Sequence, residues 1–290
     1  MLLARIYYLL FAIAGNFIIW AYKLRLILPQ YGINATEERK EKVIVSLTSY
    51  GRRVSKILPY TVCSLLRQSY KPDKIVVWLD CEHWNDHNIP MSLRRLVDYG
   101  LTIEYCDDIK SYKKLIPALN TYPNDIIITC DDDVYYSKDF VNRLVSAYYC
   151  NPKMVHCVSA HHITFVDSML APYNDWKDCY DANGKFVFPV GVGGCLYKKS
   201  FFYEDICKQH LFMKLAPNAD DVWFYFMEHL SGCDRHVLPF KYITYLPLDF
   251  FYQLFYKESL SSTNVHQSQN DIQIKTVMEY YNIQVQDIFK

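Results

Sequence analysis

The sequence lacks a charge excess of either sign. Its 290 residues include 31 Lys and Arg and 31 Asp and Glu, so the formal net charge is zero. A protein that binds nucleic acid through its phosphates needs a basic excess or a basic stripe. The charge balance therefore argues against a nucleic-acid-binding protein.

Closely spaced cysteine pairs are also missing. The chain has ten cysteines but no C-x-x-C, and most of them fall in apolar runs such as YTVCSLL and IIITCDDD. This pattern argues against a zinc cluster and against the disulfide framework of a small secreted protein. We expect free thiols in a reducing compartment.

The N-terminus has no charge between Arg5 and Lys23. An uncharged run of about seventeen residues is at the short end for a membrane span, and aromatic residues stand near both of its ends, as at a membrane interface. No small-residue cleavage site follows, so a retained anchor is favoured over a signal peptide. We predict a membrane-anchor helix over residues 1–28, either spanning the membrane or lying on it, with packing on a partner as the alternative.

A charged linker is predicted over residues 29–42. Basic residues are denser after the apolar run than before it, which favours a membrane-associated protein with a cytoplasmic body.

Residues 43–290 alternate between short apolar runs and helix-like segments, which predicts an α/β domain with a mostly parallel sheet covered on both faces. The predicted strands are KVIVSLTSY, PDKIVVWLD, LTIEYCDD and NDIIITCDDD, and the main predicted helices are SKILPYTVCSLLRQS, MSLRRLVDYG, YKKLIPALNTY and SKDFVNRLVSAYYCN, the last with Ser137 as N-cap.

Aspartates gather at the predicted carboxyl ends of these strands, where ligands bind in such sheets. Asp131, Asp132 and Asp133 directly follow the apolar run IIITC, and Asp80 ends another strand. Carboxylates on one edge repel one another unless a cation lies among them, and Mg²⁺ or Mn²⁺ prefers such oxygen ligands. If the segment is extended, Asp131 and Asp133 point the same way. The alternative is a solvated acidic turn.

Six segments in this order carry a family resemblance: VIVSLTSYGRR, KIVVWLD, SYKKLIPAL, DIIITCDDDVYY, PVGVGGCLYKK and NADDVWF. The chain resembles GT-A-fold glycosyltransferases, in particular nucleotide-sugar-dependent enzymes of bacterial surface-polysaccharide synthesis, over roughly 43–281. The resemblance implies one Rossmann-like domain with a mixed central sheet, a nucleotide-binding half over 43–135, and an acceptor-binding half with a C-terminal lid over 136–290. The P-x-Y-N pattern of the commonest inverting family is replaced by LTSYGRRV, which indicates a divergent, family-2-like branch.

The resemblance also implies a donor site built from residues at the strand ends. The residues implied in nucleotide and donor binding are Thr48, Ser49, Tyr50, Arg52, Arg53, Asp80, Lys113, Lys114, Asp131 and Asp132. Alternatives remain open: a solvated turn for the two arginines, a helix cap for Asp80, a surface position for at least one of the two lysines, and an indirect role for Asp132. Asp131 could also hold the ribose while Asp133 carries the metal. Asp131, Asp133 and His266 are the implied ligands of Mn²⁺ or Mg²⁺.

The donor sugar and acceptor would border a glycine loop and an acidic pair. The implied loop residues are Gly193 and Gly194, together with Gly191. Trp223 could stack on a sugar or belong to the core. Asp220 and Asp221 open a predicted helix, and the resemblance implies that Asp221 is the catalytic base with Asp220 as its neighbour and alternate. Helix capping is the alternative role.

We therefore expect a metal-dependent glycosyltransferase that moves a sugar, with inversion, from a nucleotide-diphosphate donor to a glycan or lipid-linked acceptor. A sugar-phosphate nucleotidyltransferase is one alternative, weakened by the single glycine in SLTSYGRR where such enzymes carry a glycine-rich loop. A non-catalytic, membrane-tethered glycan-binding scaffold is the other.

Overall fold

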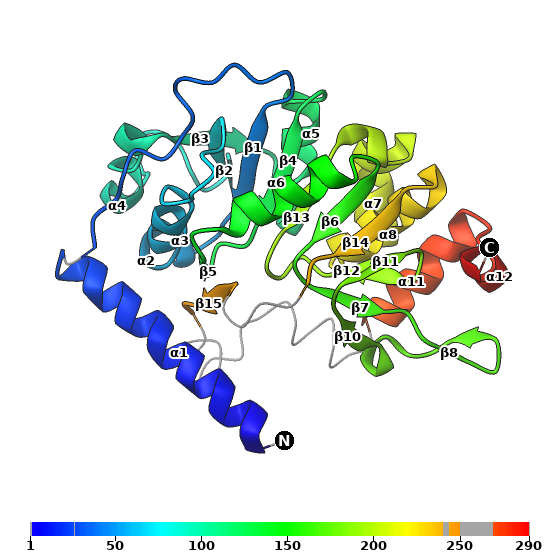
Figure 1. The fold of residues 1–290 in the computed structure, drawn as a ribbon. Coiled ribbons are helices and arrows are strands. Elements are labelled where there is room, and N and C mark those ends of the chain that lie inside the picture. The colour runs from blue at the N-terminus through cyan, green and yellow to red at the C-terminus, as the bar shows by residue number, and fades with distance from the viewer. Residues whose placement is uncertain (1, 26, 240–243, 250–268, 290) are drawn as a thin grey trace.

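The computed structural model describes all residues except 1, 26, 240–243, 250–268 and 290, which are drawn in grey in Figure 1. At its centre lies an eight-stranded sheet in the order β11-β14-β6-β13-β4-β1-β2-β3. The strands are β1 (Val43–Thr48), β2 (Lys74–Asp80), β3 (Leu101–Cys106), β4 (Ile126–Cys130), β6 (Met154–Cys157), β11 (Ala182–Gly184), β13 (Cys195–Tyr197) and β14 (Asp234–Val237).

The sheet is mixed, as predicted. Strands β3, β2, β1 and β4 are all parallel, whereas β13 runs antiparallel to both β4 and β6. Because β1, β2 and β4 are buried on both faces, their sequences are continuous apolar runs without alternation. Their carboxyl ends meet at one edge of the sheet, as the alignment of Thr48 with Trp78 and of Leu47 with Cys130 shows.

Helices lie on both sides of the sheet (Figure 1). The α-helices are α1 (Leu2–Lys23), α2 (Arg53–Lys56), α3 (Leu58–Leu65), α4 (Met91–Arg94), α5 (Ile116–Thr121), α6 (Phe140–Cys150), α7 (Gln209–Leu215), α8 (Asp220–Ser231), α11 (Gln269–Tyr280) and α12 (Val285–Phe289). Short 3-10 helices are η1 (Val97–Tyr99), η2 (Lys110–Lys114), η3 (Tyr173–Asp175), η4 (Lys199–Phe201) and η5 (Glu204–Cys207).

Each predicted helix contains a helix in the structure, but one predicted cap is wrong. Helix α6 begins at Phe140, and its N-cap position is Asp139 rather than Ser137. The Ser137 hydroxyl instead donates to the Asp139 carboxylate at 2.9 Å. An N–H of the first turn is satisfied from outside the helix, because Gln68 Oε1 accepts the Val141 N–H at 3.0 Å.

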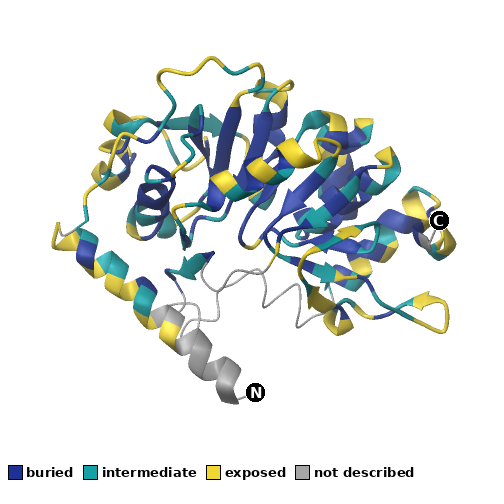
Figure 2. Ribbon diagram, in the orientation of Figure 1, coloured by how far each residue is buried: buried dark blue, intermediate teal, exposed yellow. Residues whose placement is uncertain are grey.

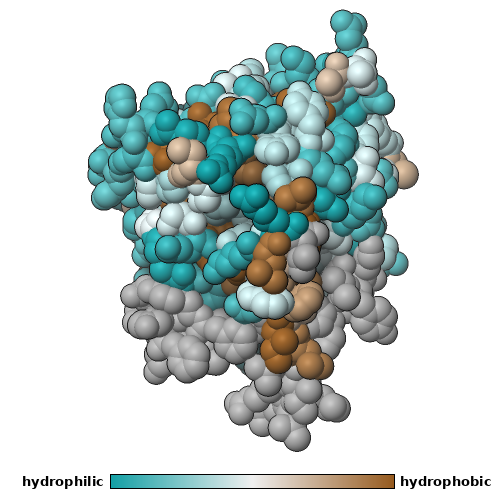
Figure 3. Space-filling view, turned by 90° about the vertical axis from the view of Figure 1, so that its left-hand side faces the viewer, coloured by the Kyte–Doolittle hydropathy of each residue, from teal (hydrophilic) through white to brown (hydrophobic). Residues whose placement is uncertain are grey.

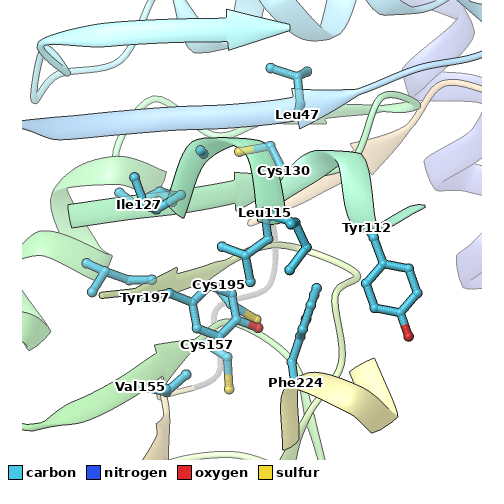
Figure 4. Packing of buried hydrophobic residues seen from close by; sticks show 14 of the residues in the cluster. Leu47, Tyr112, Leu115, Ile127, Cys130, Val155, Cys157, Cys195, Tyr197 and Phe224 are labelled. Carbon is cyan, nitrogen blue, oxygen red and sulfur yellow. The ribbon is translucent and has the colours of Figure 1, made fainter. Parts of the chain in front are cut away.

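Aromatic and aliphatic side chains fill the space between the sheet and α8. Figure 4 shows Tyr112, Leu115 and Phe224 on one side of this core, with Cys157 and Cys195 beneath the strands. The inner strands β1, β2, β4 and β13 are almost entirely buried, whereas the edge strands β3 and β11 are partly exposed (Figure 2). All ten cysteines are free thiols.

In the described part of the chain, three smaller sheets surround the central one. They are built from β5 (Val134–Tyr136), β7 (Ala160–His162), β8 (Phe165–Val166), β9 (Met169–Leu170), β10 (Lys177–Cys179), β12 (Val187–Pro189) and β15 (Tyr245–Pro247). Strand β15 pairs with β5, directly after the three aspartates, and helix α1 packs on β15.

The predicted N-terminal helix is present as α1. A search of the described residues finds no helix whose length and apolarity would let it cross a membrane. The face of α1 toward the body includes Gly15, where a Cβ would come within 2.0 Å of the Pro247 carbonyl oxygen. Glycine at this position therefore allows the helix backbone to lie directly on β15.

Candidate functional site

The three aspartates at the end of β4 face two different partners. The backbone bends at Asp132 and Asp133 instead of continuing as a strand. The Arg53 guanidinium contacts both of these residues, at 3.0 Å from Asp132 and 3.1 Å from Asp133, whereas Asp131 lines a separate cavity. The expectation that Asp131 and Asp133 point the same way assumed an extended segment, which the structure does not have here, but Asp133 still lies close enough to Asp131 to raise its pKa.

Asp132 is buried and fully partnered by the strand-one loop. Its carboxylate accepts the Ser49 hydroxyl and the Arg53 guanidinium, and its carbonyl accepts the Thr61 hydroxyl at 2.8 Å. Burial raises the pKa of Asp132 to about 6, while Arg53 opposes the shift. Asp132 thus anchors the loop after β1 to the loop after β4.

Two arginines of this loop share a carboxylate that the sequence analysis missed. Asp249 is buried; its carboxylate accepts a bond from Arg52 and lies 3.0 Å from Arg53 Nε. In the sequence it is a lone acid inside the apolar run LPLDFF, a signal that a buried charge needs a cationic partner. The arrangement places two guanidinium groups, each able to bind phosphate oxygens, at the carboxyl end of β1.

A cavity of about 280 Å³ lies beside Asp131, between the sheet edge and the start of α8. Its lining includes Lys114, Asp131, Tyr173, Gly191, Asp220 and Asp221. The acidic pair opens helix α8, as predicted. The cavity lies between this pair and the end of β4.

Lys114 is the cation at the centre of this cavity. Its ammonium lies 2.8 Å from Asp220 Oδ2 and is within electrostatic reach of Asp131 and Asp221, which raise its pKa against the effect of burial. The resemblance implies a nucleotide contact for Lys114, which remains a prediction. In the structure its side chain meets Asp220 at the start of α8.

Asp221 is the member of the acidic pair that accepts a hydrogen bond from the glycine loop. Burial and the neighbouring Asp220 raise its pKa to about 6, opposed by Lys114 and by a hydrogen bond from the Gly191 N–H at 3.1 Å. Asp220 accepts a hydrogen bond from the Ser111 hydroxyl at 2.9 Å. A carboxylate that titrates near neutral pH inside a cavity can accept a proton from a bound hydroxyl group.

Gly191 allows this cavity to form. A Cβ at this position would lie 2.7 Å from Lys114 Nζ and 2.9 Å from Asp221 Oδ1. Gly193 and Gly194 do different work: both have a positive φ, and a Cβ on Gly194 would strike the Phe140 ring at 2.6 Å. The two predicted loop glycines thus satisfy backbone and packing needs, whereas Gly191 borders the cavity.

Asp131 is the aspartate of the triplet that borders the cavity. Burial raises its pKa to about 7; Lys114 opposes the shift, and Asp133 and Asp221 add to it. Its own backbone N–H donates to the Tyr136 hydroxyl at 2.8 Å. The cavity therefore holds more negative charge than Lys114 alone compensates.

Asp80 ends β2 and belongs to a second polar cluster. It accepts the His83 N–H at 2.9 Å, which caps the following turn, and its carboxylate lies 4.0 Å from Lys113 Nζ. Lys113 also binds Asp108, at the end of the next strand. The structure shows the capping alternative for Asp80, and its contact with the nucleobase or ribose remains a prediction.

Three further predicted residues have structural partners. The Thr48 hydroxyl donates to the Trp78 carbonyl at 2.8 Å, and the exposed Tyr50 ring lies 5.5 Å from the Arg53 guanidinium. Trp223 is fully buried and donates to the Ile206 carbonyl at 3.1 Å. Stacking of Trp223 on a sugar is therefore wrong, and its place in the core is the correct alternative.

Tyr173 is a cavity residue that the sequence analysis missed. Burial raises its pKa, with a further contribution from Asp221, and its ring packs against Trp176 and Phe188. Its backbone N–H donates to Asp271 at 2.7 Å. It opens η3, in a segment of strands of only two or three residues without periodicity, so no sequence signal marked it.

The residues present suit a hard divalent cation without forming a closed site. Among the residues that the structure describes, no group of three or more His, Cys, Asp or Glu side chains could hold a metal ion, and His266 lies outside them. Mg²⁺ is commonly bound by one or two carboxylates together with substrate phosphates. Asp131 and Asp133 offer such carboxylates. Burial is the main cause of the raised pKa of Asp131, and the added repulsion from Asp133 and Asp221 is of the kind that a cation relieves.

No protein-family model and no curated protein sequence matches the chain. Solved structures with partial similarity include TarS 1–349 of S. aureus in complex with UDP, at a TM-score of 0.46 and 15% identity, covering 69% of this chain and 58% of that one. A mannosyltransferase, PcManGT from Pyrobaculum calidifontis with GDP-Man and Mn²⁺, matches at a TM-score of 0.34 and 18% identity, covering 52% and 46%.

A third similar structure is a CMP:2-keto-3-deoxy-manno-octonic acid synthetase complexed with CTP, at a TM-score of 0.42 and 10% identity, covering 69% of this chain and 90% of that one. All three TM-scores lie below 0.5, and no residue of the site is assigned from these likenesses.

Proposed function

We propose that the chain is a glycosyltransferase that uses a nucleotide-diphosphate sugar. One observation carries the proposal: a cavity at the carboxyl edge of the sheet joins Asp131, at the end of β4, to the Asp220–Asp221 pair at the start of α8, with Lys114 between them. It combines a carboxylate able to act as a base with a neighbouring group of arginines and aspartates suited to a diphosphate and its cation.

The donor lies, in this proposal, along the ends of β1, β2 and β4. Arg52 and Arg53 bind the diphosphate, and the loop from Thr48 to Tyr50 together with Asp80 and Lys113 borders the nucleoside. A divalent cation held by Asp131 and Asp133, Mn²⁺ or Mg²⁺, would stabilise negative charge on the departing diphosphate.

The acceptor hydroxyl enters the cavity beside Asp221. Asp221 takes its proton as the hydroxyl oxygen attacks the anomeric carbon, and the bond from that carbon to the diphosphate oxygen breaks. The nucleoside diphosphate leaves, and one direct displacement inverts the configuration at the anomeric carbon. Lys114 and the Gly191 N–H hold Asp221 in place and favour its ionised form.

Release of nucleoside diphosphate tests the proposal directly. The purified chain is incubated with a panel of nucleotide sugars and candidate glycan or lipid-linked acceptors, with and without Mn²⁺. We expect release from one donor, dependent on the cation and lost in Asp221→Asn. A sugar-phosphate nucleotidyltransferase would instead release pyrophosphate from a nucleoside triphosphate and a sugar phosphate, and a scaffold would give neither product.

A further inference from the structure

Helix α1 presents an apolar face that no described part of the chain covers. Leu10, Ile13, Phe17, Trp20 and Leu24, here called the N-terminal stripe, follow one another at intervals of three and four residues, so they share one side of the helix. Each is between 50% and 62% exposed. In Figure 3, hydrophobic atoms form a band in the lower half of the face shown.

The opposite side of α1 is fixed to the body. Gly15 lies against the Pro247 carbonyl oxygen, and the Tyr22 ring packs beside Tyr60 and Tyr135, at centroid distances of 5.8 and 6.2 Å. Lipid cannot surround the helix while these contacts hold. The geometry therefore suits a helix that lies along a surface rather than one that is enclosed by lipid.

Positive charge gathers where α1 ends. The first 36 residues contain three basic residues and no acidic one. Nearby, a cavity of about 350 Å³ is lined by Ile18 of α1, by Gln30 and by the side chains of Arg67 and Lys138. Arg67 also donates to the Leu28 carbonyl at 2.9 Å.

Three basic side chains form a group that is here called the basic cluster: Arg67, Lys71 and Lys138. They repel one another, and burial together with the charges of Arg67 and Lys138 lowers the pKa of Lys71. Within the described part of the chain, no carboxylate oxygen lies within 4.0 Å of the nitrogen atoms of these three side chains. Such a cluster beside an exposed apolar stripe is complementary to an anionic lipid surface, whose headgroups are negative and whose acyl region is apolar.

We propose that α1 docks the protein onto an anionic membrane surface, with the N-terminal stripe in the acyl boundary and the basic cluster on the headgroups. Trp20 suits the interface between the two. The docked helix is one strand away from the donor site, because Pro247 pairs with Val134 and the Leu248 N–H donates to the Asp133 carbonyl at 2.7 Å. Docking thus holds the donor-site edge close to the lipid.

Vesicle co-sedimentation of the full chain tests this proposal without any glycosyl transfer, so its failure is separate from failure of the proposed function. We expect binding to phosphatidylcholine vesicles that contain phosphatidylglycerol, and much weaker binding to phosphatidylcholine alone or at high salt. Phe17→Ser with Trp20→Ser should weaken binding more than tenfold. The matched control, Val166→Ser with Met169→Ser, removes equally exposed apolar groups from the β8–β9 hairpin and should bind as the parent does.

Neutralising the basic cluster with Arg67→Gln, Lys71→Gln and Lys138→Gln should weaken binding about a hundredfold, because each charge near an anionic surface contributes about fivefold. A control that neutralises three exposed lysines elsewhere, Lys153, Lys214 and Lys275, should leave binding unchanged. Light scattering separates the other occupants: a dimer that the stripe variant dissociates, without vesicle binding, would show that a second copy covers the stripe. Equal vesicle binding by the stripe variant and its control would also overturn the proposal.

Discussion

Replacing Lys114 by Met removes the cation between Asp220, Asp221 and Asp131 while keeping a side chain of similar length. A Cβ placed on Gly191 would lie 2.7 Å from Lys114 Nζ and 2.9 Å from Asp221 Oδ1. Because both atoms lie this close to the same point, they are less than about 6 Å apart. At that distance and an effective dielectric constant of about 20, their attraction is about 3 kcal/mol. Its loss should raise the pKa of Asp221 by about 2 units.

The shift has a definite sign in the pH dependence of the reaction. Asp221 must be ionised to accept a proton, and its pKa is about 6 in the parent chain. In Lys114→Met the acid limb of kcat/KM should therefore move upward, to about pH 8, and activity at pH 7 should fall about tenfold. Initial rates of nucleoside diphosphate release over a pH series measure both effects.

Lys110→Met is the matched control. Lys110 lies four residues earlier and binds the Asn218 side chain at 2.7 Å instead of a carboxylate, so its loss should leave the acid limb in place. Loss of Lys114 leaves buried carboxylates without their cation, which can lower the free energy of unfolding by about 3–5 kcal/mol. Melting curves at each pH therefore test whether both variants are folded under the assay conditions. If Lys114→Met lost activity at every pH without moving the limb, the electrostatic role of Lys114 would be refuted.

Three further outcomes follow from the same geometry. The free energy of unfolding of the parent chain should fall as pH rises from about 4 to about 7, because the raised pKa of Asp131 makes the folded state bind a proton that the unfolded state has lost. In urea unfolding across a pH series, Asp131→Asn should remove a pH dependence worth up to about 4 kcal/mol. The same pH dependence in the parent and the variant would contradict the burial argument. Gly191→Ala places a Cβ 2.7 Å from Lys114 Nζ, which should lower turnover in the release assay more than tenfold while nucleotide affinity stays within about twofold. Unchanged turnover would show that the cavity accommodates the added methyl group. Asp249→Asn removes the negative charge that partly neutralises Arg53, so calorimetry should show tighter binding of the nucleoside diphosphate. Melting curves should show a lower Tm, because the buried guanidinium loses its partner. Weaker nucleotide binding would mean that the arginines do not bind the diphosphate.

Local pattern was enough to predict the elements that carry the site. The apolar runs that became β1, β2 and β4 are short and bounded by turn residues, and the charges that follow them mark the strand ends, which parallel pairing brings together. The start of α8 at Asp220 was predictable for the same reason, because two acids open an amphipathic segment.

Contacts between distant segments were not predictable in this way. Lys114 meets Asp220 across more than a hundred residues, and Asp249 meets Arg53 across nearly two hundred. The direction of each side chain depends on how η2 and β15 pack, which no periodicity records. Trp223 illustrates the opposite error: its position near the acidic pair in sequence suggested a sugar platform, but helix geometry turns it into the core.

Donor turnover in Asp221→Asn tests the central claim most directly. The parent chain and the variant are each titrated with the nucleotide sugars and Mn²⁺, reading thermal stabilisation for binding and nucleoside diphosphate release for transfer. The account predicts that one nucleotide stabilises both proteins while only the parent releases product in the presence of acceptor. Release at the parent's rate by Asp221→Asn, or a folded parent chain that no nucleotide stabilises, would contradict it.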